Sequence, residues 1–336
     1  MKTVKLCDNK EGIYSAAQIL RDGGVVAIPT ETVYGLAASA QSDEAIAKVF
    51  AAKGRPQDNP LIVHINSEEM LCSVVSELPE AAKKLASAFW PGPLTMVLKK
   101  SDKVAESVSR GLDTVAVRMP ANKVALEIIK EADLPLAAPS ANISGSPSPT
   151  SPHHVIADLN GKIDAVVMSD DCSVGVESTV VTLATDPPRL LRPGAVTAEQ
   201  LSEFLPNLVI DKAVLSEPEK GEKVASPGMK YKHYSPKTEV FLVEGDSNSF
   251  AELVNQKENC LAICFLEDED KLSVKTLCYG KATDALSQAQ KIFALLREAD
   301  NSGAKAIYVH APEKKGVGLA VYNRLIRAAA FKVIKL

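Results

Sequence analysis

The sequence predicts an α/β protein with two domains of unequal size, and three observations lead to that prediction. The chain has 336 residues, which is long for one domain. Short apolar runs alternate with amphipathic stretches of helical period in both parts of the chain. Between Lys212 and Pro236 this alternation stops, and proline, glycine and serine become frequent. The composition, 46% hydrophobic and 24% charged, is that of a globular protein with a full core.

The first domain is expected to span residues 1–210 and to contain a mixed sheet. A helix is expected from Asp8, its cap, to about Leu20, and another from its cap Ser42 to Lys53. Further helices are expected near residues 79–89, 121–132 and 198–204. Strands are expected at residues 25–28, 61–65, 94–98, 114–119, 165–168 and 178–183. Because some strands follow one another without a helix between them, the sheet cannot be purely parallel.

Residues 211–237 are expected to form a basic linker, and residues 238–336 a smaller domain. Lysines and aromatic residues interleave in the linker, at Lys220, Lys223, Lys230, Tyr231, Lys232, His233, Tyr234 and Lys237. After it, strands are expected at 239–243, 260–265, 272–279 and 306–310, with helices near 247–256, 283–298 and 317–330. This order predicts three layers around a mainly parallel sheet. The stretch SGSPSPTSP, residues 144–152, is expected to be a surface loop.

Charge and cysteine content exclude several classes of protein. The net charge is −4, and residues 1–210 hold 19 Lys and Arg against 25 Asp and Glu, which argues against charge-driven binding of nucleic acid. The six cysteines form no CxxC pair and have no histidines at zinc-site spacing, so buried free thiols are expected. No signal-peptide core and no apolar run of membrane length is visible, which predicts a cytoplasmic protein without a membrane partner.

Common catalytic motifs are absent from the sequence. It contains no GxxxxGK[ST], GxSxG or HExxH, and GVGLAV has Val321 where a dinucleotide fingerprint needs a third glycine. Polar stretches instead flank the apolar strands, namely PTETVYG, KGRPQDNP, VRMP, APSANISG, GVESTVV and LRPG. Since ligands of α/β folds commonly bind at strand ends, these stretches are expected to form one pocket.

The predicted pocket combines cations with hydroxyl groups. The cations are Lys53, Arg55, Arg118 and Arg192, and the hydroxyls are those of Thr30, Thr32, Ser140, Ser178 and Thr179. Guanidinium forks bind phosphate and carboxylate equally well, so a triphosphate and an amino acid would suit such a set. Simpler interpretations stay open at this point. KGRP is also a common helix end, His64 in LIVHI could be a core residue, and Arg118 could pair with a surface acid.

These motifs, together with WPGPLT, SPGMKYKHYSP and the closing GVGLAVYNRLIRAA, closely resemble the two-domain members of the YrdC-like threonylcarbamoyl-AMP synthases. The resemblance covers almost the whole chain in the right order. It implies a YrdC-like α/β catalytic domain with a mixed twisted sheet, a basic linker, and a smaller Rossmann-like α/β domain. It also implies the reaction of L-threonine, bicarbonate or CO2 and ATP to L-threonylcarbamoyl-adenylate and pyrophosphate, for threonylcarbamoyladenosine modification of tRNA.

The resemblance further implies roles for individual residues. The threonine pocket is expected to comprise Thr32, His64, Arg118, Ser140 and Ser178. Nucleotide contacts are expected from Arg55, Asn59, Asn142, Arg192 and Tyr234, with Tyr234 and its linker neighbours as a lid. Lys53 and Arg55 are the expected catalytic residues, Lys53 through a phosphate or carbamate contact. Mg²⁺ is expected to enter with ATP, on the phosphates and not on protein side chains.

Two other classes remain possible from sequence alone. The first is an RNA-binding module without ATP turnover, which the acidic first domain disfavours. The second is a larger carbamoyl-transferring enzyme, which would carry further segments that this chain does not have. The implied partner of the product is the tRNA threonylcarbamoyl transferase machinery. Direct contact with tRNA and the role of the second domain are left open.

Overall fold

The computed structural model describes residues 2–55, 59–216 and 234–336, which form two sheets with helices around them. The strands of the larger, eleven-stranded sheet run in the order β1-β8-β2-β3-β7-β4-β6-β5-β9-β10-β11. Their bounds are β1 (Val4–Cys7), β2 (Val26–Ile28), β3 (Gly35–Ser39), β4 (Ile62–His64), β5 (Leu94–Lys99), β6 (Thr114–Arg118), β7 (Leu136–Ala137), β8 (Ala165–Met168), β9 (Thr179–Thr182), β10 (Arg189–Arg192) and β11 (Val209–Ile210). Parallel pairs such as β4–β6 and antiparallel pairs such as β5–β6 both occur, so the expected mixed sheet is confirmed.

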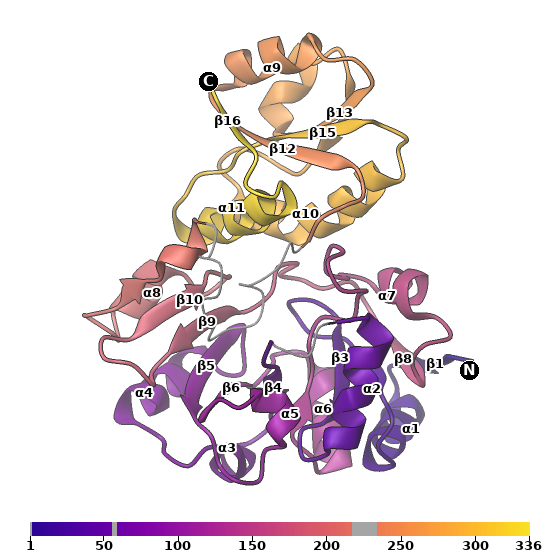
Figure 1. The fold of residues 1–336 in the computed structure, drawn as a ribbon, viewed down its shortest axis with the longest axis vertical. Coiled ribbons are helices and arrows are strands. Elements are labelled where there is room, and N and C mark those ends of the chain that lie inside the picture. Colours follow the sequence, from indigo (N-terminus) through magenta and orange to yellow (C-terminus); the bar gives the residue numbers. More distant parts are fainter. Residues whose placement is uncertain (1, 56–58, 217–233) are drawn as a thin grey trace.

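Helices surround this sheet in the large domain (Figure 1). They are α1 (Lys10–Arg21), α2 (Asp43–Lys53), α3 (Glu68–Val74), α4 (Glu80–Phe89), α5 (Glu106–Ser109), α6 (Lys123–Ala132), α7 (Pro152–Leu159) and α8 (Ala198–Ser202), followed by the 3-10 turn η1 (Lys212–Val214). Helix α2 begins as expected, because the Ser42 side chain accepts a hydrogen bond from the amide of Ala45. It ends at Gly54, which has a left-handed φ of 57°.

The smaller sheet has the strand order β14-β13-β15-β12-β16, and each strand pair that the structure describes in it is parallel. Its strands are β12 (Glu239–Glu244), β13 (Cys260–Cys264), β14 (Lys275–Cys278), β15 (Ala306–His310) and β16 (Val333–Lys335). Its helices are α9 (Ser247–Asn255), the 3-10 helix η2 (Leu266–Lys271), α10 (Ala285–Asp300) and α11 (Gly316–Ala328). The predicted three-layer domain is therefore confirmed.

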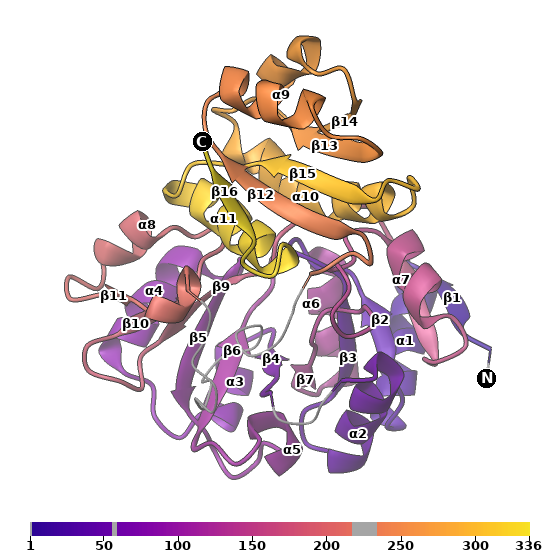
Figure 2. The ribbon, with the colours of Figure 1, turned by 45° about the horizontal axis from the view of Figure 1, so that its top comes forward.

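The two domains pack closely through one layer of helices. Helices α10 and α11 lie between the smaller sheet and the large domain, while α9 covers the opposite face (Figures 1 and 2). Val33 and Val176 of the large domain belong to the same apolar core as α10 and α11. The boundary between the domains is therefore a continuous buried core and not a wet gap between two bodies.

Three expectations from the sequence were wrong in detail. Asn9 caps helix α1 instead of Asp8, since the Asn9 side chain accepts the amide hydrogen of Gly12. The stretch 144–152 is not a surface loop, because residues 147–152 are buried where α7 and the second domain meet it. Only part of the cysteines is buried, since Cys7 and Cys72 are exposed. In the described part of the chain, no helix combines the length and apolar character needed to cross a membrane.

Candidate active site

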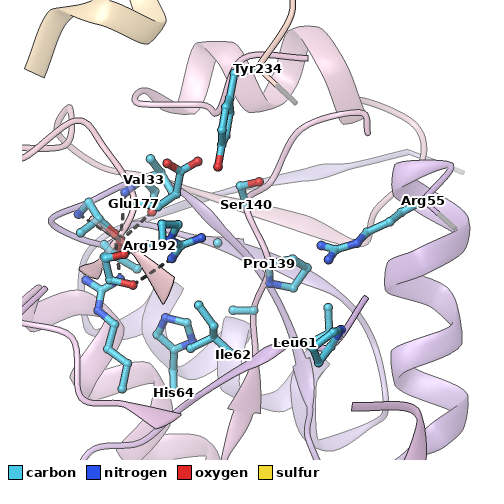
Figure 3. Close-up of a pocket in the computed structure, with 17 residues that line it drawn as sticks. Val33, Arg55, Leu61, Ile62, His64, Pro139, Ser140, Glu177, Arg192 and Tyr234 are labelled. Atoms are coloured by element: carbon cyan, nitrogen blue, oxygen red, sulfur yellow. Dashed lines mark hydrogen bonds between the residues drawn. The ribbon is translucent and has the colours of Figure 1, made fainter. Parts of the chain in front are cut away.

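A pocket opens at the strand ends of the large sheet (Figure 3). Its space is about 620 Å³, including open solvent at the mouth. The walls come from segments far apart in the sequence: Thr30, Thr32, Val33, Gly35, Arg55, Pro60, Leu61, Ile62, His64, Arg118, Ala138, Pro139, Ser140, Glu177, Ser178, Arg192 and Tyr234. The structure thus brings eight of the eleven predicted site residues to one cavity, namely Arg55, Arg192 and Tyr234 beside the five expected to bind threonine.

Strand register explains why the innermost residues meet. His64 and Arg118 are paired positions at the ends of the parallel strands β4 and β6. Arg118 is buried and donates to the Thr32 hydroxyl at 2.8 Å and to the Gly92 carbonyl at 3.2 Å. Its remaining nitrogen lies 2.6 Å from a carboxylate oxygen of Glu31, without hydrogen-bond alignment. Arg118 is therefore a fixed buried cation and not a mobile surface residue, and the acid it pairs with, Glu31, has only 10% of its side chain exposed.

Ser178 and Arg192 form a second rigid group on the wall. Arg192 donates from Nε to the Ser178 carbonyl at 3.0 Å and from Nη2 to the Ser178 hydroxyl at 3.1 Å. That hydroxyl also lies 2.7 Å from the hydroxyl of Thr95. Burial lowers the pKa of Arg192 somewhat, but a guanidinium still keeps its charge at neutral pH. An anionic group that enters the pocket would meet this cation without further rearrangement.

Glu177 brings a carboxylate to the same wall and is held from two sides. One of its oxygens accepts the Ser148 hydroxyl at 2.5 Å, and the other accepts Nε of Arg324 at 2.7 Å. Burial alone would raise the pKa of Glu177, but Arg324, Arg192 and the Ser148 hydrogen bond outweigh it and leave the pKa below its usual value. Glu177 is therefore an anion in the pocket wall and a weak base.

Arg55 shows how the two interpretations of KGRP combine. Lys53 and Gly54 end helix α2, as the capping interpretation requires. The chain then turns, and the guanidinium of Arg55 points into the pocket toward Pro139 (Figure 3). Its carbon Cζ lies 6.0 Å from the ring centre of Phe50, so an aromatic face supports the cation. The helix end thus serves to aim Arg55.

The other three predicted residues do not line the cavity. The ammonium group of Lys53 is buried and donates to the carbonyls of Ser140 and Asn142. The Asn142 amide donates at 2.8 Å to the carbonyls of Ile143 and Ser146. In this structure Lys53 and Asn142 therefore shape the 140–146 loop, and their direct contacts with substrate remain predictions. Asn59 is buried and has no hydrogen-bond partner for its side chain among the described residues. The predicted lid residues 217–233 lie outside the described part of the chain.

His64 is a neutral buried imidazole that faces the pocket. Burial and the nearby Arg118 guanidinium lower its pKa to about 3. Its ring nitrogen Nδ1 has no hydrogen-bond partner among the residues that the structure describes. One buried ring nitrogen is therefore left for a ligand, which a core histidine with both nitrogens paired would not offer.

We expect the imidazole of His64 to stay neutral between pH 5 and pH 8. The proton resonances of its ring should not shift over this range in an NMR titration, with a His64→Ala variant to assign them. A midpoint near the ordinary histidine value of about 6.5 would contradict the buried position.

Two carboxylates and one arginine were not predicted as site residues. Glu31 and Glu177 occur in PTETVYG and GVESTVV. The predicted pocket was based on cations and hydroxyl groups, and it did not include these carboxylates. An unpaired buried carboxylate is costly, so an acid within a motif that was predicted to line a pocket with arginines was a usable signal. Arg324 lies 147 residues from Glu177, and the sequence contains no signal that relates them.

No group of three or more His, Cys, Asp or Glu residues in the described ranges could hold a metal ion. The one carboxylate of the described pocket lining, that of Glu177, already accepts hydrogen bonds at both oxygens.

Comparison with known proteins places these features in a family. A family model described as telomere recombination matches residues 18–194, and a model for the C-terminal domain of threonylcarbamoyl-AMP synthase matches residues 196–330. A threonylcarbamoyl-AMP synthase from Pyrococcus abyssi is 44% identical, and the match covers 95% of this chain and 94% of that protein. One from Bacillus subtilis is 42% identical, over 99% of this chain and 97% of that protein.

A solved structure shares the whole architecture. The crystal structure of Pyrococcus abyssi Sua5 complexed with L-threonine superposes with a TM-score of 0.91 at 41% identity, and the match covers 100% of both chains. Both domains and their arrangement are thus similar in the two proteins. The chain belongs to the threonylcarbamoyl-AMP synthase family of enzymes.

Proposed function

We propose that the protein joins L-threonine, bicarbonate or CO2 and ATP into L-threonylcarbamoyl-adenylate, with release of pyrophosphate, and that the product serves threonylcarbamoyladenosine modification of tRNA. The observation that carries the proposal is the pocket wall, where Arg118, Arg192 and Arg55 face one cavity together with hydroxyls and a neutral histidine. Such a cavity suits an amino acid next to a triphosphate. The L-threonine complex of the Pyrococcus abyssi protein supports threonine as that amino acid.

The chemistry requires positioning and charge stabilisation and no protein nucleophile. The neutral amine of threonine attacks the carbon of CO2, a C–N bond forms, and the amine loses a proton to give a carbamate. From bicarbonate the same carbamate forms with loss of water. A carbamate oxygen then attacks the α-phosphorus of ATP, and the bond to the β-phosphate oxygen breaks as pyrophosphate leaves with its electrons. The absence of a catalytic triad from the sequence is consistent with this route.

The pocket provides a place for each substrate group. The carboxylate of threonine would lie beside Arg118 and the hydroxyls of Thr32 and Ser178. The threonine hydroxyl would satisfy Nδ1 of His64. Arg55 and Arg192 would contact the phosphates, where they neutralise charge as pyrophosphate leaves. Ser140 lies at the bridge to Gly35, where it would touch the carbamate or the amine.

Mg²⁺ would enter with ATP, bound by phosphate oxygens and water. Its positive charge would stabilise the departing pyrophosphate. Phosphate oxygens would be the main ligands of Mg²⁺, because both Glu177 oxygens already accept hydrogen bonds from Ser148 and Arg324.

The proposal is tested by incubating the protein with ATP, Mg²⁺, ¹³C-bicarbonate and each amino acid in turn. Pyrophosphate should appear with threonine, and mass spectrometry should detect a labelled threonylcarbamoyl-adenylate. Omission of any one component should abolish both signals. If instead tRNA shifts in a salt-sensitive manner and ATP is never consumed, the RNA-binding alternative is favoured.

Replacing Arg55 should weaken ATP binding. We expect Arg55→Ala to raise the Kd for ATP on the order of 30-fold, because a charge-assisted contact of about 2 kcal/mol is lost. Arg55→Lys should restore only part of it, since an ammonium cannot form a bidentate fork. Calorimetry with ATP and Mg²⁺ measures both. An unchanged Kd for Arg55→Ala would mean that Arg55 only completes the helix end.

A further inference from the structure

We propose that Arg324, in helix α11 of the smaller domain, is a positioning residue of the active site and acts through Glu177. The inference rests on the proposed function, because it assigns the smaller domain a part in the same reaction. Arg324 is not among the residues that line the pocket. Its influence on substrate must therefore pass through the residues it holds.

Arg324 grips both the side chain and the backbone of Glu177. The guanidinium is fully buried, with 0% of the residue exposed. Its Nε donates to the Glu177 carboxylate at 2.7 Å, and its Nη2 donates to the Glu177 carbonyl at 3.2 Å. The remaining nitrogen, Nη1, donates to the side-chain oxygen of Asn323 at 2.7 Å. Two contacts from a planar group fix the position and the orientation of Glu177 together.

The grip on Glu177 reaches the groups that would contact substrate. Ser178 follows directly in the chain, and its hydroxyl and carbonyl both accept hydrogen bonds from Arg192. Glu177, Arg192 and Tyr234 all line the pocket (Figure 3). The ring of Tyr234 also lies 5.8 Å from the guanidinium carbon of Arg324. A shift of Glu177 would therefore displace one hydroxyl and one cation of the pocket wall.

The two domains are in close backbone contact at Gly175, just before Glu177. Gly175 has a φ of +81°, in the left-handed region that favours glycine. A Cβ added there would lie 2.3 Å from Cα of Gln290 in helix α10, closer than atoms can approach. The smaller domain thus presses on the 175–177 segment at the backbone level, and Arg324 continues this contact into the pocket.

The competing explanation is that the contact between Arg324 and Glu177 only holds the two domains together. A second ion pair between the domains provides the control for that explanation. Arg297 of helix α10 lies 2.8 Å from the carboxylate of Asp158 in helix α7. Neither residue lines the pocket. Asp158 also accepts the amide hydrogen of Ile143 at 3.3 Å, a hydrogen bond that the side-chain oxygen of asparagine can keep. The variant Asp158→Asn therefore breaks the ion pair and leaves in place the hydrogen bond from Arg297 to the Pro147 carbonyl.

The experiment compares Arg324→Met with Asp158→Asn in the full chain, at a temperature where circular dichroism shows both to be folded. We expect Arg324→Met to lower kcat/KM for threonine about 100-fold, because a displacement of about 1 Å in a site has effects of that size. Asp158→Asn should stay within about threefold of the parent. Arg324→Lys should recover part of the loss, since it keeps the charge but not the fork.

A double variant tests whether Arg324 acts through Glu177. If it does, adding Arg324→Met to Glu177→Gln should lower kcat/KM little beyond Glu177→Gln alone, since coupled residues are not additive. Independent, multiplicative losses would overturn the proposed route. If Arg324→Met does not fold, Arg324→Lys and Arg324→Gln replace it, each compared alone and together with Glu177→Gln.

The outcomes separate this inference from the function on which it rests. If the parent protein releases no pyrophosphate with threonine, the proposed function fails. If the parent is active and Arg324→Met, or its folded substitute, keeps the parent kcat/KM, only the positioning role fails. An equal loss of kcat/KM in Arg324→Met and Asp158→Asn would likewise overturn it, because breaking any ion pair between the domains would then lower activity, whether or not it involves Glu177.

Discussion

Threonine should support pyrophosphate release with a kcat/KM on the order of 10⁴-fold above that of valine. The two amino acids have nearly the same shape, so apolar contacts alone would separate them poorly. The difference arises because valine would leave a buried polar group unpaired. In this pocket that group is Nδ1 of His64, which has no partner among the described residues. Pyrophosphate release measured over a range of amino-acid concentrations gives both values.

Serine and a histidine variant sharpen this test. Serine keeps the hydroxyl and loses one methyl contact, worth ~1–3 kcal/mol, so its kcat/KM should lie between those of the other two. The variant His64→Ala should lower the preference for threonine over valine at least tenfold, since the group that valine leaves unpaired is gone. Equal kcat/KM for threonine and valine in the parent protein would refute the threonine assignment.

Arg118→Ala should reduce kcat/KM for threonine on the order of 10³-fold. The variant removes a buried guanidinium from the proposed carboxylate site, and truncation of one partner of a buried charge pair costs about 2–5 kcal/mol. Part of that cost appears as lost stability, because Glu31 keeps a carboxylate 10% exposed without its cation. Thermal unfolding must therefore be recorded along with the kinetics.

A second substitution separates binding from stability. Arg118→Lys keeps a positive charge near Glu31, so its Tm should lie closer to that of the parent. It should still bind threonine poorly, because one ammonium cannot contact Thr32, Gly92 and a substrate carboxylate at once. If calorimetry on folded Arg118→Ala gave the parent Kd for threonine, Arg118 would serve only to hold Glu31 and Thr32.

Much of the fold could be predicted because its signals are local. Ser42 and Gly54 mark both ends of helix α2, and the strands β4, β5, β6 and β9 are rich in valine, isoleucine, leucine and threonine. Strand β3 was missed, because GLAAS is rich in glycine and alanine, which have little strand preference. Strand β3 also pairs with β7, which is about 100 residues away, and no local pattern in the sequence indicates that pairing. The burial of residues 147–152 likewise depends on long-range contacts, with Tyr34 at Pro149, Cys172 at Thr150 and Arg297 of the second domain at Pro147.

The residues of the candidate site likewise divide into those that local sequence predicts and those whose role depends on tertiary contacts. Residue types at strand ends predicted which side chains would share a pocket, and most of them line it. The sequence did not predict that Lys53 turns toward main-chain carbonyls, since a buried ammonium selects its partners in three dimensions. The contribution of Arg324 was out of reach for the same reason. A hydrogen bond across 147 residues depends on how two domains dock, and no short pattern records that.

The core shared by the two domains has a consequence during synthesis on the ribosome. Val33 and Val176 emerge early, yet their apolar partners lie in α10, α11 and the neighbouring strands. Residues 237–336 must still be translated, which takes about 5–20 s at about 5–20 residues per second. During that interval the nascent large domain exposes the apolar surface around Val33 and Val176, and Glu177 lacks its Arg324 partner. We expect chains arrested near residue 236 to bind general chaperones, and chains long enough to expose helix α11 outside the ribosome to be free of them.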